Sequence, residues 1–373
     1  MTNLLALFIS LAISTSHICQ YIAEEFGTEF AQNYNAAIEA HDKMWESYPF
    51  PDYYAGHYFC EGGNFHLNLT QAESETFSEL ADNVQVVENS HKELLEIAAI
   101  ITEYAQKTPD CQLKLTAWGL DTRNNCVVVY LQDITDDAAE IFAKEVTDSP
   151  VVRLTEGNPV ATLVPRALVN PALSQTAETI EPGTRIYIGN FGFSAGYPAL
   201  RGNTPGFVTA LHGLPLEHEL VRYGSPTGPI IGQVADPIKF ENAADGAFIT
   251  LEDANFSHTA DGKPLTPSHI RPAQGMILAS ISTPPIGDTH IQRNIVVTNA
   301  HFSANFGDGL VLTDLIQTTG TAMYGESGGL VVRFTENTAE IMGIIVGSNS
   351  ATNANMFFAW ADSVDKAVDV TPE

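Results

Sequence analysis

The chain has 373 residues, of which 44% are hydrophobic and 17% are charged. This length and composition are typical of a folded protein of two domains and exclude a largely disordered chain. The formal net charge of −28 argues against nucleic acid as a partner, because no basic stripe is available to neutralise phosphates.

The N-terminus carries an export pattern. Leu4 to Ile13 is an apolar run, and the small residues Ser14, Thr15 and Ser16 follow it. The pattern predicts a signal peptide over 1–16 and a secreted protein. No later run approaches the ~20 apolar residues of a membrane span, so no membrane association is expected. The four cysteines lie at positions 19, 60, 111 and 126. In an exported protein they could form up to two disulfides, and the sequence leaves the pairing open.

Residues 17–165 mix helix and strand patterns. His91 to Gln106 carries apolar residues at helical spacing, which predicts an amphipathic helix. The stretches "QLKLTAW" and "CVVVYLQ" predict two strands joined by the turn "DTRNN", and "DDAAEIFAKEV" predicts a short helix. The sequence therefore predicts an α+β domain, with no catalytic constellation, over 17–165. A proline-rich connector reaches to about residue 180.

The rest of the chain reads as short strands separated by turns rich in Gly, Pro, Asn and Asp. Examples are "TRIYIGNFGF", "GFVTALHG", "GAFITLED", "GMILASIS", "NIVVTNAHF" and "EIMGIIVGS". About eight to twelve strands with almost no helical periodicity predict a barrel or a sandwich. The last segment, "WADSVDKAVDV", is the exception and predicts a short C-terminal helix.

The stretch "YGESGGL", residues 324–330, places Ser327 among glycines. A serine nucleophile needs an adjacent base, and that base needs an orienting group. No histidine follows Ser327, which excludes the order of an α/β-hydrolase. Upstream, "FVTALHG" ends a predicted strand at His212, and "AADGAFITL" supplies Asp245. His301 also ends a strand, but only 26 residues separate it from the serine, too few for an acid-bearing strand and its crossover, so we interpret it as structural.

These motifs resemble those of chymotrypsin-like serine proteases of the trypsin superfamily. "FVTALHG", "DGAFITL" and "GESGGLVV" are similar to the His, Asp and Ser motifs of that family, and their order and spacing fit its bacterial streptogrisin and α-lytic protease branch. "GTRIYIGNFGF" and "FFAWADSVDKAV" resemble the opening strand and the closing strand and helix of that branch. "YYAGHYFCEGGNFHLNLT" and "AWGLDTRNNCVVVYL" resemble parts of its pro-domain, so the likeness covers most of the chain.

The resemblance implies a fold and an activity. It implies two six-stranded antiparallel β-barrels over 175–373 with a short C-terminal helix, preceded by a smaller α+β pro-domain. The pro-domain would assist folding of the protease and inhibit it before being cut away. The chain would be a monomeric, secreted zymogen of a serine endopeptidase that acts on polypeptides. It would need no cofactor and no metal.

The resemblance also assigns roles to residues. Ser327 would be the nucleophile, His212 the general base and then acid, and Asp245 the group that orients the imidazole. The N–H groups of Gly325 and Ser327 would form the oxyanion hole. The position expected at the pocket floor holds no acid, so we expect cleavage after small or medium apolar residues. The expected substrate-binding residues are Thr321, Ala322, Tyr324, Val346, Gly347 and Ser348.

The sequence departs from the family pattern at three places. Gly213 replaces the cysteine that follows the histidine, and the whole catalytic half has no cysteine. Glu326 replaces the aspartate before the serine, and Val346 stands where a serine is expected to bind the triad acid. These differences leave an alternative open, a catalytically inactive protease-like binding protein, which a secreted but uncut chain would favour.

Overall fold

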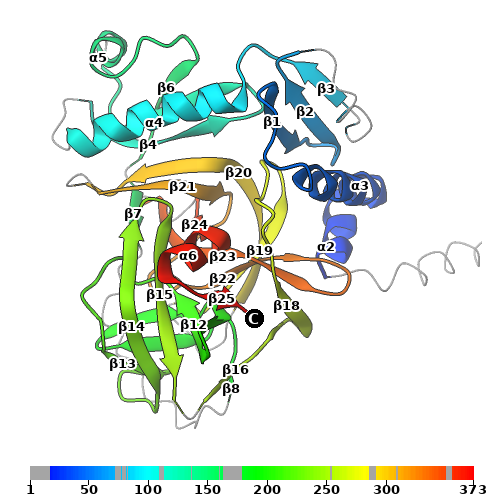
Figure 1. The fold of residues 1–373 in the computed structure, drawn as a ribbon. Helices are drawn as coiled ribbons and strands as arrows, with labels where there is room; N and C mark the ends of the chain where they lie inside the picture. The colour runs from blue at the N-terminus through cyan, green and yellow to red at the C-terminus, as the bar shows by residue number, and fades with distance from the viewer. Residues whose placement is uncertain are drawn as a thin grey trace, which may run out of the picture.

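The N-terminal part of the chain forms an α+β region, drawn in blue and cyan in Figure 1. The computed structural model describes residues 17–71, 77, 81, 83–108, 113–135, 137–158, 160–162, 179–252, 254–284, 291–307, 310–349 and 355–373. The predicted signal peptide and most of the predicted connector lie outside these residues. The elements of the region are α2 (His17–Phe26), α3 (Thr28–Trp45), β1 (Tyr54–Phe59), β2 (Phe65–Leu69), β3 (Asn83–Val86), α4 (His91–Lys107), β4 (Leu115–Asp121), β5 (Cys126–Leu131), α5 (Ala138–Glu145) and β6 (Val152–Glu156).

Helix α4 is the amphipathic helix that the sequence predicts. A capping box starts it: the Glu93 N–H donates to the Ser90 hydroxyl, and the Glu93 carboxylate accepts from the Ser90 N–H at 2.7 Å. Its apolar face packs Leu94 and Ile101 against β4 and β5, where Trp118 is fully buried. The predicted strand pair and the short helix α5 are present as well.

The first half of the remaining chain is a closed antiparallel barrel. The pairing follows the order β10-β9-β13-β14-β15-β12-β11, and β10 runs on into β11 after Ala195 and Gly196, so the ladder returns to its start. Six strands, one of them interrupted, therefore enclose a core that includes Phe207, Val221 and Ile249. The strands are β9 (Arg185–Ile188), β10 (Phe191–Ser194), β11 (Tyr197–Arg201), β12 (Thr204–Thr209), β13 (Leu220–Tyr223), β14 (Ile230–Glu241) and β15 (Ala244–Leu251).

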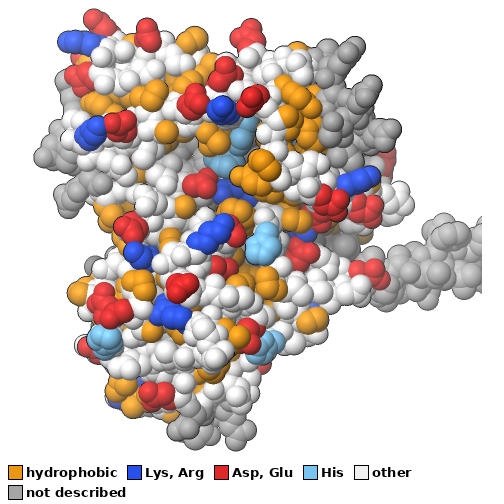
Figure 2. All heavy atoms as spheres, in the orientation of Figure 1, with side chains coloured by type: hydrophobic (Ala, Val, Ile, Leu, Met, Phe, Trp, Pro, Cys, Tyr) orange, Lys and Arg blue, Asp and Glu red, His pale blue; other side chains and the backbone are white. Residues whose placement is uncertain are grey.

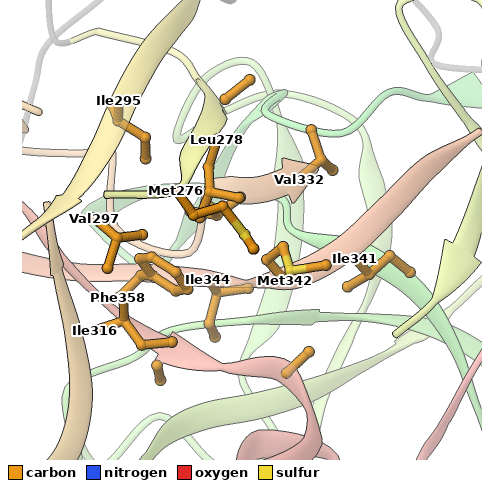
Figure 3. Packing of buried hydrophobic residues seen from close by; sticks show 14 of the residues in the cluster. Met276, Leu278, Ile295, Val297, Ile316, Val332, Ile341, Met342, Ile344 and Phe358 are labelled. Atoms are coloured by element: carbon orange, nitrogen blue, oxygen red, sulfur yellow. The ribbon is translucent and has the colours of Figure 1, made fainter. Parts of the chain in front are cut away.

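A second barrel follows, and each of its six strands pairs antiparallel with two neighbours in the cycle β19-β20-β21-β24-β23-β22. Leu278, Ile295 and Phe358 fill its interior and are almost fully buried (Figure 3). These barrels confirm the predicted fold class. The strands are β19 (Ile277–Ser282), β20 (Ile291–Asn305), β21 (Val311–Thr318), β22 (Leu330–Phe334), β23 (Ala339–Asn349) and β24 (Phe357–Trp360).

Short elements complete the fold. The predicted C-terminal helix is α6 (Ala361–Val368), and Val364 on its buried face lies against β15. The remaining pieces are β7 (Val160–Thr162), β8 (Thr179–Ile180), β16 (Asn255–Phe256), β17 (Thr259–Ala260), β18 (Lys263–Pro267) and β25 (Thr371–Pro372).

The α+β region is docked on the second barrel. Strand β4 pairs antiparallel with β20, so one sheet runs from the barrel into the N-terminal region (Figure 1). Gly119 allows this approach, because a Cβ there would lie 2.8 Å from the His301 carbonyl oxygen. On the same interface Arg333 of β22 binds both carboxylate oxygens of Asp42 on α3, at 2.6 and 2.9 Å. Both contacts hold the first third of the chain against the last third.

The described helices and cysteines bear on the predicted export of the chain. None of the described helices is long and apolar enough to cross a membrane. Cys60 and Cys126 are free thiols in the structure. Cys111 and the side chain of Cys19 lie outside what the structure describes, so no disulfide is shown.

Candidate active site

His212, Asp245 and Ser327 meet in one hydrogen-bonded series. His212 Nδ1 lies 2.6 Å from Asp245 Oδ2, and His212 Nε2 lies 2.7 Å from Ser327 Oγ. The first two residues come from the first barrel, and the serine precedes β22 of the second. All three are buried: 2% of the His212 side chain is exposed, and Ser327 and Asp245 are 0% exposed. Because a carboxylate only accepts, Nδ1 carries the proton and Nε2 is left to accept from the serine hydroxyl.

The backbone around Asp245 fixes the histidine. Asp245 Oδ1 accepts the N–H groups of His212 at 2.9 Å and of Leu211 at 3.3 Å. His212 has φ +55°, in the left-handed region, which costs an ordinary residue about 1–2 kcal/mol. The next residue of β15 is Gly246, where a Cβ would lie 2.6 Å from Val364 of α6. The glycine therefore lets the C-terminal helix cover the strand that carries the acid.

The loop around Ser327 uses its glycines for conformation and for close packing. Gly325 has φ +86° and Gly328 has φ +83°, a region that side chains rarely adopt. A Cβ on Gly328 would lie 2.5 Å from the carbonyl oxygen of Ser194 and 2.9 Å from the N of Ala210. The glycines thus allow strands of the first barrel to pass directly behind the serine.

Glu326 is fully buried and forms an ion pair at 2.8 Å with Arg293 of β20. Its other carboxylate oxygen accepts the N–H of Met323 at 2.7 Å. The Glu326 carboxylate is thus held by a cation and a backbone donor. Arg293 was not predicted, because it lies on a different strand and no local motif marks it.

The structure brings the two segments of the expected substrate site together. The Ser348 hydroxyl on β23 donates to the Ala322 carbonyl at 3.2 Å. Val346 is fully buried, whereas Thr321 is exposed and Tyr324 is 48% exposed. Gly347 of β23 is not open to another strand, because the chain's own β7 pairs antiparallel with it.

His301, the rival base, lies in a separate cluster. Its Nδ1 is 2.7 Å from Asp314 Oδ1, and its ring lies edge-on to His91 at 4.9 Å. Burial is the largest cause of a lowered pKa at both histidines. It lowers the pKa of His301, and it brings the pKa of His91 to about 3. The cluster borders a cavity of about 680 Å³ between the α+β region and the second barrel, and Figure 2 shows histidine and basic side chains in the hollow between these parts. Sequence patterns did not reveal it, because its members are far apart in the chain.

Among the described residues, no group of three or more His, Cys, Asp or Glu side chains could hold a metal ion.

Comparisons place the chain near one family model and several solved structures. Residues 92–157 match the model described as a Pro-like C-terminal domain. A glutamic-acid-specific serine protease is 21% identical, with TM-score 0.42, over 52% of this chain and 100% of its own. Thermobifida fusca protease A is 20% identical, with TM-score 0.41, over 52% of this chain and 98% of its own. A Nocardiopsis protease is 18% identical, with TM-score 0.42, over 52% of this chain and 99% of its own.

Proposed function

We propose that the chain is the zymogen of a serine endopeptidase. The observation that carries the proposal is the continuous hydrogen-bonded series from Asp245 through His212 to Ser327. The series has the geometry that a hydroxyl needs for activation, with base and orienting acid both within hydrogen-bond reach.

The proposed reaction follows from this geometry. Ser327 Oγ attacks the carbonyl carbon of the peptide bond while its proton passes to His212 Nε2, and Asp245 stabilises the imidazolium. The N–H groups of Gly325 and Ser327 bind the oxyanion of the tetrahedral intermediate. His212 then gives its proton to the leaving amine, which leaves an acyl-enzyme. Water activated by the same histidine hydrolyses the ester and frees the serine.

Substrate preference is proposed from the residues near the serine. The segment Thr321–Tyr324 holds no acid that could pair with a basic side chain, and its hydrogen-bond partner on β23 is the uncharged Ser348, whose hydroxyl donates to the Ala322 carbonyl. We expect cleavage after small or medium apolar residues. A peptide library that instead showed preference for Arg or Lys would contradict this specificity.

The N-terminal region would inhibit the enzyme until it is removed. The pairing of β7 with β23, at Thr162↔Gly347 and Ala161↔Ser348, supports this role, because this is the strand where substrate backbone is expected to bind. The full burial of the triad in the uncut chain also supports it. We propose a pro-domain over 17–165, a connector to about 180 and a monomeric catalytic domain over 175–373, exported by the signal peptide over 1–16.

The proposal is tested by following maturation in a secreting host. The expected result is loss of the N-terminal region by cleavage between about 160 and 180, and proteolysis of an unstructured protein substrate by the remaining fragment. Ser327→Ala should remain uncut and inactive. A wild-type chain that is folded and secreted, yet uncut and inactive, would favour the inactive binding protein.

A further inference from the structure

Arg185, at the start of β9, packs against the loop that carries the proposed oxyanion donors. It is 6% exposed, and its Nη2 donates to the carbonyl oxygens of Thr283 at 2.5 Å and of Pro284 at 2.6 Å. A Cβ on Gly325 would lie 2.9 Å from Arg185 Cζ, and one on Gly192 would lie 3.2 Å from Nη1. The guanidinium thus occupies the space beside Gly325 that a side chain at position 325 would fill.

Hydrogen bonds tie the same elements together. The Ser194 hydroxyl of β10 donates to the Gly325 carbonyl at 3.0 Å and accepts the Thr283 N–H at 3.2 Å. The Ser194 N–H donates to the Ser327 carbonyl at 2.8 Å. Thr283 in turn donates its hydroxyl to the Gly183 carbonyl at 2.6 Å. Gly325 is therefore anchored at its carbonyl by Ser194 and covered at its α-carbon by Arg185.

The backbone of Gly325 needs such contacts to stay in one conformation. Position 325 has φ +86°, where a Cβ would be strained and would also collide with Arg185, so glycine is needed. Glycine also has the widest choice of alternative backbone conformations, and some of these would rotate its N–H away from the oxyanion. An oxyanion donor acts only if its direction is fixed before the reaction. Contacts at the Gly325 carbonyl and α-carbon, made by residues outside the loop, are suited to keep it in one conformation.

We infer that Arg185 is a positioning residue for the oxyanion hole: its guanidinium holds Gly325, and with it the direction of the Gly325 N–H. The inference rests on the proposed protease function. The catalytic half has no cysteine that could restrain this region covalently. Arg185, Thr283 and Ser194 supply a non-covalent restraint.

The test compares Arg185→Met and Ser194→Ala with the wild-type protease on one peptide substrate. Active enzyme is counted by fluorophosphonate titration, so that poor folding does not enter kcat. We expect Arg185→Met to lower kcat about 10- to 100-fold, because a misplaced donor stabilises the transition state poorly. KM should change less than about twofold, since the ground-state carbonyl gains little from the hole. Affinity for a peptide aldehyde, whose hemiacetal oxygen occupies the hole, should fall in parallel with kcat.

Arg185→Lys keeps a cation that can reach the carbonyl groups but loses the planar group over Gly325, so it should recover kcat only in part. Arg201→Met is the matched control. Arg201 of β11 donates to the carbonyl groups of Asp236 on β14 and of Val368 at the end of α6, and neither acceptor belongs to the loop around Ser327. Its loss should lower Tm and leave kcat and aldehyde affinity unchanged.

An active wild-type enzyme with unchanged kcat and aldehyde affinity in Arg185→Met would overturn the inference and leave the proposed function standing. If Arg185→Met does not fold, Ser194→Ala decides by the same two measurements, with an expected loss of about 3- to 10-fold in both. Unchanged values in Ser194→Ala would then overturn the inference. A folded, mature-length wild-type protein with no activity would overturn both the inference and the proposed function.

Discussion

The buried carboxyl group of Asp245 accepts hydrogen bonds from three donors. Its two oxygens accept from the ring of His212 and from the N–H groups of Leu211 and His212. Val346, where the sequence resemblance leads us to expect a serine, therefore does not leave the carboxylate without partners. The same bonds hold His212 in its left-handed conformation, so the acid both orients the ring and stabilises the backbone.

Replacing Asp245 by Asn should change the tautomer of the His212 ring while keeping the packing around position 245. The amide would donate to Nδ1 instead of accepting from it, so the proton would move to Nε2, which could no longer accept from Ser327. We expect kcat to fall about 10⁴-fold with the fold retained. The measurement is peptide hydrolysis at pH 7 and 25 °C. A loss of less than tenfold would show that Asp245 does not set the tautomer.

We expect the ion pair between Glu326 and Arg293 to hold the loop around Ser327 in position, and so to affect both stability and kcat. Glu326→Gln keeps an acceptor for the Met323 N–H but removes the charge that pairs with Arg293. We expect a destabilisation of about 2–4 kcal/mol, because the cation loses a buried partner, and a lower kcat. Urea unfolding and kinetics measure the two effects. Lys239→Gln, which removes an exposed ion pair with Glu241, is the control and should change stability by less than about 1 kcal/mol.

At the level of elements, β7 is the piece of the chain that pairs with the proposed substrate strand, β23. It contributes three residues to the edge of β23, and Val160 packs on the core of the second barrel. Short edge strands are readily displaced, because few hydrogen bonds and little apolar area hold them. In the proposed zymogen, a segment held this weakly could block the substrate strand and still be removed during maturation.

Val160→Asp should weaken the pairing of β7 with β23. The added charge would be partly buried against apolar side chains, so β7 should dissociate more often. We expect a fluorophosphonate to label the uncut chain faster than it labels the uncut wild-type chain. Val84→Asp, on an exposed face of β3, is the control and should leave the rate unchanged. Equal rates for Val160→Asp and wild type would mean that β7 does not limit access.

At the scale of the whole molecule, the α+β region and the second barrel share a buried polar interface. Arg333 joins Asp42 of α3 to Glu340 of β23, and β4 extends the barrel sheet. Four histidines lie near this contact, three from the N-terminal region and one from the barrel. His41 and His57 are buried, and His91 and His301 are half-buried. Docking of the two parts should therefore respond to pH.

The lowered pKa values of these histidines determine whether docking becomes stronger or weaker as the pH falls. Burial lowers the pKa of each of the four histidines, although Asp42 and Asp314 oppose the shift at His41 and His301, and Arg333 and Arg271 reinforce it there. An exposed histidine titrates near pH 6.5, so the undocked form binds more protons below that pH. The stabilising effect of the docked, neutral histidines is present above about pH 6.5 and is lost as pH falls. For His91 the docked form itself takes up its proton only near pH 3.

Hydrogen exchange of the β4 amides measures this effect. After correction for intrinsic exchange rates, protection of β4 should be lower at pH 5 than at pH 7. His57→Gln, which removes one buried imidazole, should reduce the difference. Equal protection at both pH values would contradict a role for the histidines in docking.

The sequence predicted the elements that have local patterns. The strands of both barrels, helix α4 and the C-terminal helix follow the periodicity of their apolar residues, and the motif spacing pointed to His212, Asp245 and Ser327 together. The polar residues Asp362 and Ser363 do not cap the C-terminal helix, which begins at Ala361 after Trp360. Contacts between distant segments were not predictable. Arg293 pairs with Glu326 across 33 positions, and Arg185 reaches Gly325 across 140, and no local signal records either partnership. The pairing of β7 with β23 also depends on how the two parts dock.

The most direct test of the proposed catalytic site is fluorophosphonate labelling of the secreted protein, read by intact mass, with Ser327→Ala beside it. The account predicts one adduct on a fragment of about 200 residues, the length expected for a domain over 175–373, and none on the variant. An adduct that persists in Ser327→Ala, or its absence from a folded, cut wild-type protein, would contradict the assignment of Ser327 as the nucleophile.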